Sequence, residues 1–469
     1  MKKKSFAISM LIVLFLIGCN KDNESPEEPQ LLVAEEGEEL SAGPFNTIFS
    51  TSTQSFGFPS PGLSGLEELF FFTGNSFFTQ NWVSSPASTT AIDGLGPVFN
   101  GRSCTSCHSR DGRGQPPTGV GDFAGGLLLR LSISGTDEYG GPNPHPVYGD
   151  QLSDRSLPGV PAEGQFAITY EYIQGEFSDG TSYELRMPSY ELINLNFGPA
   201  DVMVSPRVGQ QVIGLGLLEA IDENDIIALS DPADLDGDGI SGKPNFVWDI
   251  ASQSHVLGRF GWKANMPNLL QQTAGAFVGD IGITSSMFPM ENCTDAQGDC
   301  QATTNGGSPE IEDDNIDAVL IYISNLAVPA RRDVDAQDVL KGKNIFNNIG
   351  CASCHVPSFT TGAHPRFNHL SNQKIRPYTD LLLHDMGEGL ADNRPDYEAD
   401  GNEWRTPPLW GIGLIETVNN HTFFLHDGRA RNIEEAVLWH GGEAESSKNA
   451  YTQLSKADRE RLLKFLNTL

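Results

Sequence analysis

The sequence predicts a mainly α-helical protein of two domains, the first of which carries β-hairpin insertions. Two near-copies of one short cysteine-histidine segment, at Cys104 and at Cys351, divide the 469-residue chain. Helix-capping signals dominate the last third of the chain, whereas period-two alternation is limited to one stretch around Asp179-Gly180. A chain of this length can hold two or three domains, each with its own core.

The N-terminus carries a secretory signal. Basic residues (Lys2 to Lys4) precede an apolar run (Phe6 to Ile17), and Leu16-Ile17-Gly18-Cys19 resembles the bacterial lipobox. We therefore predict that residues 1–18 are a lipoprotein signal peptide and that Cys19 becomes the lipidated first residue of the mature protein. The alternatives are an ordinary secretory signal and a short membrane anchor, for which this apolar run is short.

Composition divides the rest of the chain into three parts. Residues 19–55 begin with a Glu-, Pro- and Gly-rich stretch and predict a flexible tether. Residues 56–330 form the predicted first domain, and residues 331–469 form the second. Within the first domain, Phe166 to Arg186 alternates polar and apolar residues about Asp179-Gly180, which predicts a β-hairpin.

Three further stretches predict helices. Val212 to Ile221 is apolar enough for a buried helix, although its two glycines weaken the pattern. A helix is predicted to begin after Asn432, with two glutamates in its first turn, and to end at Gly441-Gly442. Ser455 to Asp458 resembles a capping box that opens a final helix over residues 456–468.

Each cysteine-histidine segment predicts a covalent haem site of the c type. Both have the pattern Cys-x-x-Cys-His, in which two thiols form thioethers to one porphyrin and the histidine becomes the proximal iron ligand. At the Cys and His frequencies of this chain, one chance match should occur roughly 0.002 times. The predicted attachment residues are Cys104, Cys107 and His108 in the first segment and Cys351, Cys354 and His355 in the second.

Two other kinds of site compete for these segments. A structural zinc site would need further close-spaced cysteines or histidines, and a histidine after the second cysteine is not part of a thioredoxin-type dithiol motif. Both are disfavoured. The stretches ahead of the two segments, Gly94 to Phe99 and Lys341 to Phe346, are similar to each other. Each suits a helix that packs its aromatic residue on the haem.

The remaining cysteines and one acidic stretch give two further predictions. Cys293 and Cys300 predict a local disulfide in an oxidising compartment, with two free thiols as the alternative. Asp234, Asp236 and Asp238 have the oxygen spacing of a calcium loop. Asn245 stands where such a loop has its bidentate glutamate, so an acidic turn without an ion is the alternative.

The net charge of −31 excludes some partners. Binding of nucleic acid through a basic face is disfavoured at this charge. A cationic redox partner protein is compatible with it, as is an acidic surface without any such role. Apart from the N-terminal run, no stretch is long and apolar enough to cross a bilayer.

Several strings carry a family resemblance. The last third resembles the electron-transfer domain of bacterial di-haem cytochrome c peroxidases, and the chain from about residue 60 to residue 469 resembles the di-haem oxidoreductase family sometimes labelled thiol-oxidoreductase-like. The resemblance implies two cytochrome-c-like haem domains. The strings that carry it are residues 99–104, 214–221, 258–264, 382–387, 404–409, 424–429 and 433–437.

The resemblance also implies ligands for the C-terminal haem. Where the peroxidases have a methionine on the helix after the Glu-Glu-Ala-Val string, this chain has His440. This implies bis-histidine ligation by His355 and His440, and therefore a lower reduction potential than His/Met ligation would give. Met386 is the competing sixth ligand, and a role of His440 as a helix cap is the third alternative.

The resemblance also implies candidates for the distal side of the N-terminal haem. The faint match of Gly258-Arg259 and the stretch after it to the peroxidases implies that Gln272 lies in the distal pocket. The glutamate expected ten residues later is Gly282 here, and Asp280 is the nearby carboxylate that could serve as the acid-base residue. Candidate sixth ligands, each with packing or surface roles as the alternative, are His145, Met187, Met203, His255 and Met266.

Two pairs of residues in the motif strings have provisional roles. Trp262 and Trp410 are candidates for bridging electrons between the domains, with simple core packing as the alternative. His426 and Arg429 are predicted to bond haem propionates or to fix a loop.

These observations predict an exported di-haem c-type oxidoreductase in the bacterial cell envelope, lipid-anchored and facing away from the cytoplasm. The C-terminal haem would relay electrons to a peroxidase-like N-terminal haem. A redox partner protein and a small substrate such as peroxide are the expected partners, with the membrane contacted through the N-terminal lipid. The alternatives are a non-catalytic di-haem electron carrier and a thiol or thiosulfate oxidase.

Overall fold

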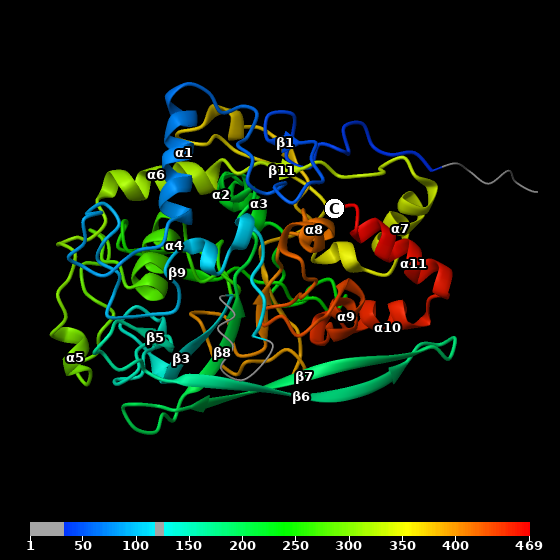
Figure 1. Cartoon of the computed structure of the whole chain (residues 1–469). Coiled ribbons are helices and arrows are strands. Elements are labelled where there is room, and N and C mark those ends of the chain that lie inside the picture. The colour runs from blue at the N-terminus through cyan, green and yellow to red at the C-terminus, as the bar shows by residue number, and fades with distance from the viewer. Residues whose placement is uncertain (1–31, 118–125) are drawn as a thin grey trace, which may run out of the picture.

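The structure, a computed structural model, describes residues 32–117 and 126–469 (Figure 1). The prediction of a mainly α-helical protein is wrong, because only 27 % of the described residues are helical and 20 % are in strands. The described strands pair in small sheets of two or three strands. Helical signals concentrate in the last third of the chain, while the central part forms strands and long connections rich in glycine and proline, which break helices.

Two pairs of crossing helices support the two cysteine-histidine turns. α1 (Leu66–Thr79) packs on α6 (Asp313–Ser324), and α7 (Gln337–Asn348) packs on α11 (Lys456–Leu466). A glycine lies at each crossing. A Cβ on Gly74 would lie 1.9 Å from the carbonyl oxygen of Ala318, and one on Gly342 would lie 2.1 Å from that of Arg461. Only glycine allows the backbones to approach this closely.

The same glycine-to-aromatic spacing recurs in both halves. Phe78 follows Gly74 by four residues and its ring lies 6.3 Å from that of His108. Phe346 follows Gly342 by four residues and its ring also lies 6.3 Å from that of His355. The repeat predicted for Gly94 to Phe99 is therefore misplaced. Val98–Phe99 is a strand, β2, and the helix that corresponds to α7 is α1.

The longest strands form the predicted hairpin. β6 (Gln165–Glu176) pairs antiparallel with β7 (Ser182–Ile193), and Asp179-Gly180 lies in the turn. In Figure 1 this hairpin runs along one edge of the molecule from β3 (Leu127–Thr136) to α10 (Glu445–Gln453). Its tip contacts the second half of the chain. The Arg459 guanidinium pairs with Asp179 at 2.9 Å and lies 3.8 Å from the ring centre of Phe177.

A second sheet in the first half has three strands in the order β4-β3-β8. Smaller elements complete the fold, and their bounds follow. The other strands are β1 (Thr47–Ile48), β3 (Leu127–Thr136), β4 (Pro142–Asn143), β5 (Arg155–Ser156), β8 (Met203–Val208), β9 (Phe246–Asp249), β10 (Ser254–Leu257), β11 (Val328–Pro329), β12 (Phe359–Thr360), β13 (Lys374–Ile375), β14 (Leu383–Asp385) and β15 (Glu403–Arg405). The other helices are α2 (Leu215–Glu219), α3 (Glu223–Ile227), α4 (Leu269–Ala276), α5 (Gly298–Gln301), α8 (Ile415–Asn419), α9 (Ile433–Trp439) and α10 (Glu445–Gln453).

The capping signals place two helices of the second half. The Asn432 side chain accepts a hydrogen bond from the Glu435 amide at the start of α9. The Ser455 side chain accepts one from the Asp458 amide at the start of α11. The helix predicted for Val212 to Ile221 is shorter, because only Leu215–Glu219 is helical and Gly214 has a positive φ.

The two predicted domains share one continuous hydrophobic core in the described residues. Several connections join the two halves, for example the Arg113 guanidinium, which donates to the carbonyl of Phe423 at 2.8 Å. The predicted signal peptide (residues 1–18) lies outside the described residues, and so does the first part of the predicted tether, including Cys19. In its described part Glu38, Ala42 and Asn46 are fully buried. None of the described helices has the length and apolarity needed to cross a membrane.

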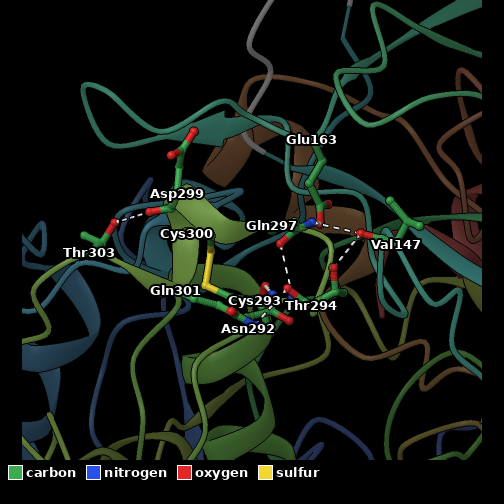
Figure 2. Close-up of a disulfide and its surroundings, with 11 residues drawn as sticks. Val147, Glu163, Asn292, Cys293, Thr294, Gln297, Asp299, Cys300, Gln301 and Thr303 are labelled. Carbon is green, nitrogen blue, oxygen red and sulfur yellow. Dashed lines mark hydrogen bonds between the residues drawn. A yellow bond between two sulfur atoms is a disulfide. The ribbon is translucent and has the colours of Figure 1, made fainter.

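A disulfide joins Cys293 and Cys300 (Figure 2). The loop that it closes holds two distant segments of the first half. Gln297 Nε2 donates to Glu163 Oε1 at 2.6 Å and to the carbonyl oxygen of Val147 at 3.0 Å, and Thr294 Oγ1 donates to the same carbonyl at 2.8 Å. Burial raises the pKa of Glu163 to about 7.

Replacing Cys293 and Cys300 together by alanine should lower the free energy of unfolding by about 2 kcal/mol. The reason is the loss of a loop constraint over a sequence separation of 7 residues. Denaturant unfolding of the wild-type protein and the variant measures the difference, and the visible spectrum should stay unchanged because the pair lies outside the cavity described below. An equally stable variant would contradict the prediction.

Candidate active site: two cysteine-histidine turns on one cavity

One cavity reaches both cysteine-histidine turns. Its lining includes Cys104, Cys107 and His108 from the first half and Cys351, Cys354 and His355 from the second. Its volume is about 410 Å³, which is within the range of cofactor sites in proteins. The structure therefore brings the two predicted attachment segments, nearly 250 residues apart, to the walls of one space.

The first turn fixes the orientation of His108. A short 3₁₀ helix (Cys104–Ser106) opens it, and the His108 amide donates to the Cys104 carbonyl at 2.9 Å. His108 Nδ1 lies 2.6 Å from the carbonyl oxygen of Gln210, so Nδ1 carries the proton and Nε2 is left for another partner. Metal-bound histidines are usually held by such a carbonyl. Gly209 leaves room for the ring, because a Cβ there would lie 3.1 Å from His108 Cε1.

The second turn repeats this arrangement and adds a second histidine. His355 Nδ1 lies 3.0 Å from the carbonyl oxygen of Tyr378, and His440 Nδ1 lies 2.7 Å from that of Ala436. Both rings therefore keep Nε2 free. Their centres are 6.4 Å apart.

This separation fits one metal atom between the two rings. Two metal–nitrogen bonds of about 2.0 Å, with about 1.2 Å from each nitrogen to its ring centre, sum to about 6.4 Å. Met386, the competing ligand, also lines the cavity just after β14. The distance between the rings is compatible with ligation by His355 and His440, and the choice between His440 and Met386 stays a prediction.

The four cysteines of the turns are free. Burial raises the pKa of Cys104 and Cys107 to about 12, and the nearby Asp280 carboxylate adds to both shifts. Burial also raises the pKa of Cys351 to about 12. Redox dithiols react as thiolates with lowered pKa values. The raised pKa values of these buried thiols therefore disfavour a redox dithiol.

Buried polar atoms of the cavity wall have no hydrogen-bond partner among the described residues. Gln210 Nε2, Asn265 Oδ1 and His426 Nε2 are examples. The Arg405 guanidinium, which is buried beside them, donates to Gln210 Oε1 at 2.9 Å. Unpaired buried groups are costly unless a ligand satisfies them. The Gln210 amide nitrogen and the Arg405 guanidinium are donors that suit the carboxylates of a porphyrin, so the residues present fit a haem at this cavity.

Gln272 and Asp280 both line the cavity on the side of the first turn. Gln272 comes from α4, and Asp280 comes from the π-helical turn that continues it (Phe277–Ile281). Such π turns often occur at functional sites. The Asp280 carbonyl accepts from the amides of Asn100 at 2.8 Å and Gly101 at 3.0 Å, which ties this turn to the segment that leads into Cys104.

The carboxylate of Asp280 lies in a defined environment. Gln151 Nε2 donates to its Oδ1 at 2.9 Å. Burial raises the pKa of Asp280, and this effect exceeds the opposing influence of Arg130, Gln151 and His108. A raised carboxyl pKa is typical of acid-base residues in enzymes.

The structure explains why no glutamate occupies position 282. Gly282 has φ +76, and a Cβ there would lie 2.6 Å from the Cα of Gly96 and 3.0 Å from the Val98 carbonyl oxygen. No side chain fits at this position. An acid in this pocket must therefore come from another position, and among the described cavity residues Asp280 has the required chemistry.

Sequence analysis missed two cavity residues. Arg130 lies beside Asp280 and pairs with Asp150 at 2.9 Å. Its signal is a charged residue in the middle of the apolar strand β3. His384 is buried with Nε2 2.8 Å from Asp380 and Nδ1 2.6 Å from Glu443. Burial opposes protonation, but hydrogen bonds to Asp380, Cys354 and Glu443 raise the pKa of His384 well above its ordinary value.

The five candidate sixth ligands predicted for the N-terminal haem differ in whether they line the cavity. Met266 lines the cavity, whereas the other four candidates do not. His145 Nδ1 accepts from two backbone amides, and His255 Nε2 lies 2.8 Å from the Tyr139 carbonyl. Met187 and Met203 belong to β7 and β8.

In each of the two residue pairs with predicted roles, one member lines the cavity and the other does not. Trp262 lines the cavity and donates to the Val208 carbonyl at 2.8 Å, while Trp410 is buried elsewhere. His426 lines the cavity and stacks on Trp404, with ring centres 3.8 Å apart. Arg429 does not line it and instead pairs with Asp427 at 2.9 Å.

The predicted calcium loop forms an exposed acidic turn. Asp231, Asp234 and Asp236 bring carboxylate oxygens within 4.8 Å of one another, and Asp238 is not part of this group. Asp238 Oδ1 instead accepts from the Ile240 amide at 2.8 Å. Calcium binding by Asp234, Asp236 and Asp238 stays a prediction.

Among known protein families, residues 38–469 match the family described as "Di-haem oxidoreductase, putative peroxidase". The cytochrome c551 peroxidase of Nitrosomonas europaea is 25 % identical to this chain over 232 residues. That similarity covers 47 % of this chain and 64 % of the peroxidase, so the chain spans less than two thirds of that relative. No solved structure matches the chain.

Proposed function

The chain belongs to the di-haem oxidoreductase family, and we propose that it is a peroxidase-like enzyme with two haems of the c type. In this proposal Cys104, Cys107 and His108 hold the catalytic haem. The relay haem is held by Cys351 and Cys354, with His355 and His440 as its axial ligands. The relay haem passes electrons from a redox partner protein to the catalytic haem. The observation that carries the proposal is the difference between the two turns.

That difference lies on the face opposite each proximal histidine. His440 faces His355 at a distance that suits a doubly ligated metal, which favours electron relay. No ring contact of this kind joins His108 to another histidine of the described residues. Gln272 and Asp280 line the same cavity, and we assign them to the open face of the catalytic haem. A face that carries an amide and a carboxylate suits bond-making chemistry.

A bound haem supplies the two-electron cleavage of the peroxide O–O bond. The protein's part is to move protons. A carboxylate oxygen of Asp280 takes the proton from one peroxide oxygen and delivers it to the other, which leaves as water. Gln272 orients the peroxide by hydrogen bonding. In total, two electrons delivered through the relay haem and two protons from the solvent convert one peroxide into two waters.

We place this activity outside the cytoplasm. Support comes from the signal-like N-terminus, the covalent attachment of haem, which takes place outside the cytoplasm, and the disulfide. Lipid anchoring through Cys19 and calcium binding at the acidic turn belong to the same proposal. The acidic chain, with a net charge of −31, suits a cationic redox partner.

One sample tests this function. The purified holoprotein is reduced and titrated with carbon monoxide, and peroxide consumption is then measured with a reduced cytochrome as donor. We expect one haem per chain to bind carbon monoxide and peroxide to be consumed with donor oxidation. Two haems that bind no carbon monoxide, together with no turnover, would assign the protein to non-catalytic electron carriers. Turnover of thiosulfate or a thiol without peroxide would favour the oxidase alternative.

The ligand His440 has its own test. Replacing His440 by methionine should raise the reduction potential of the relay haem, on the order of 100 mV, because a thioether stabilises the reduced iron. A spectroelectrochemical titration measures the shift, and Met386→Leu serves as the matched control, for which we expect no change. The opposite result, a shift in M386L and none in H440M, would make Met386 the ligand.

A further inference from the structure

The exposed apolar side chains of this protein concentrate near its N-terminal part. Seven large ones lie between residues 45 and 72, and we call them the apolar patch. Phe49 is 74 % exposed, Leu66 72 % and Leu69 61 %. The members of the patch are Phe45, Phe49, Phe58, Leu66, Leu69, Phe70 and Phe72.

The helix α1 is apolar on two sides. Its inner side, with Phe71, Gly74 and Phe78, is buried against α6. Leu66, Leu69 and Phe72 are exposed, where a surface helix of a globular protein normally carries polar residues. This helix therefore presents an outward face that the described residues leave without a cover.

Contacts link the patch on α1 to the strand before it. The Gly62 amide, just before α1, donates to the Phe45 carbonyl at 2.8 Å. β1 pairs with β11 between Phe45 and Phe49, and the Ala327 amide beside it donates to the Phe58 carbonyl at 2.9 Å. Figure 1 shows α1, β1 and the first described residues along one edge of the molecule.

The charge distribution sets this region apart from the rest of the chain. Glu67 and Glu68 are the only charged residues from Ser41 to Ile92, although the net charge is −31. An acidic protein is repelled by an anionic lipid surface. A segment with few charges and exposed phenylalanines is the part of this molecule that can approach such a surface and bury apolar area in it.

The position of the proposed lipid anchor indicates that the surface covering this face is the lipid bilayer. Cys19 precedes Leu32, the first described residue, by a length of chain that cannot exceed about 45 Å. The lipid therefore holds the protein close to the bilayer by the same N-terminal part that carries the patch.

We propose that the apolar patch docks on the lipid bilayer and inserts its phenylalanine and leucine side chains at the boundary of headgroups and acyl chains. This inference rests on the proposed lipid anchor for its choice of partner. It adds that the protein lies on the membrane in one orientation. The hairpin β6–β7, on the opposite edge in Figure 1, then faces away from the bilayer.

The experiment uses the mature holoprotein produced behind a secretory signal without a lipobox, so that it carries no lipid. It is mixed with phosphatidylcholine vesicles and sedimented. We expect the lipid-free protein to sediment with the vesicles, and Phe49→Ser/Leu66→Ser/Leu69→Ser to partition at least tenfold less. Tyr172→Ser/Ile173→Ser, at exposed apolar positions of β6, is the matched control and should partition like the wild-type protein.

Three outcomes would overturn the docking proposal. The lipid-free wild-type protein could stay in the supernatant at all lipid concentrations, or the control could lose as much binding as the patch variant. A dimer in sedimentation velocity without vesicles, lost in the patch variant, would assign the patch to a second copy of the chain. The mass of natively produced protein tests the anchor separately, so the anchor can fail while vesicle binding stands.

Discussion

Replacing Asp280 by asparagine should lower kcat/KM for peroxide by about 10²–10⁴-fold, the usual contribution of a positioned acid-base residue. Asparagine keeps the size of the side chain and can still accept the hydrogen bond from Gln151 Nε2. It cannot take a proton from peroxide. Stopped-flow reduction of peroxide by the prereduced protein measures the effect, and binding of carbon monoxide should be retained.

The pH dependence of the same step follows from the burial of Asp280. Burial raises the pKa of this carboxyl above its ordinary value of 3.8, and only the deprotonated form can take the peroxide proton. We therefore expect kcat/KM to rise with pH, through a midpoint above the ordinary carboxyl range, and to level off at higher pH. The Asp280→Asn variant should lack this rise.

Asp154→Asn is the matched control for Asp280→Asn. Asp154 lies on the same network, since Asn100 Nδ2 donates to its Oδ1 at 3.2 Å, and burial also raises its pKa. It does not line the cavity. We expect kcat/KM of the Asp154→Asn variant to remain within about twofold of the wild-type value, because a residue outside the cavity should affect the catalytic step little. If both variants lose activity equally, the loss reflects the network and not proton transfer by Asp280.

Replacing Cys351 and Cys354 together by alanine should remove one haem and abolish turnover with a protein donor. The relay site would lose both covalent links, while the first turn and its Gln272 and Asp280 are unchanged. Intact mass and a pyridine haemochrome assay should count one haem per chain. Carbon monoxide should still bind to that haem, because we assign the open face to the first turn.

The reciprocal variant, Cys104→Ala/Cys107→Ala, separates the two roles. It should also retain one haem, but that haem should be doubly ligated and bind no carbon monoxide, since His355 and His440 occupy both faces. The Cys293→Ala/Cys300→Ala variant controls for general damage and should retain two haems. Carbon monoxide binding in the reciprocal variant, and none in the first, would exchange the assigned roles.

Local sequence patterns predicted individual helices and the hairpin correctly, but they did not predict the fold class. Capping residues placed α9 and α11, because a cap is a contact between residues three positions apart. Alternation about Asp179-Gly180 predicted the hairpin β6–β7, because its two strands are consecutive in the chain and joined by a short turn. The fold class was wrong, because the helical signals of the last third were extended to a central region that pairs its strands in many small sheets.

The internal repeat was assigned to the wrong stretch. The spacing of glycine and phenylalanine in Gly74 to Phe78 matches that in Gly342 to Phe346, but the first pair lies 30 residues before Cys104 and the second only 9 before Cys351. Proximity in sequence favoured Gly94 to Phe99, which forms β2. The true match is visible only where both helices cross a partner at their glycine.

The sequence by itself indicated haem as the cofactor, which the family match supports, because the spacing of two thiols and an imidazole that predicts covalent attachment lies within five consecutive residues. It also offered His440 and Asp280 as candidates. Only the tertiary structure showed that the rings of His355 and His440 lie 6.4 Å apart. It also showed that position 282 has no room for a side chain. The same holds for the cavity, which Arg130, Gln210 and His384 line together. These relations depend on contacts between segments tens to hundreds of residues apart, and no local pattern encodes such distances.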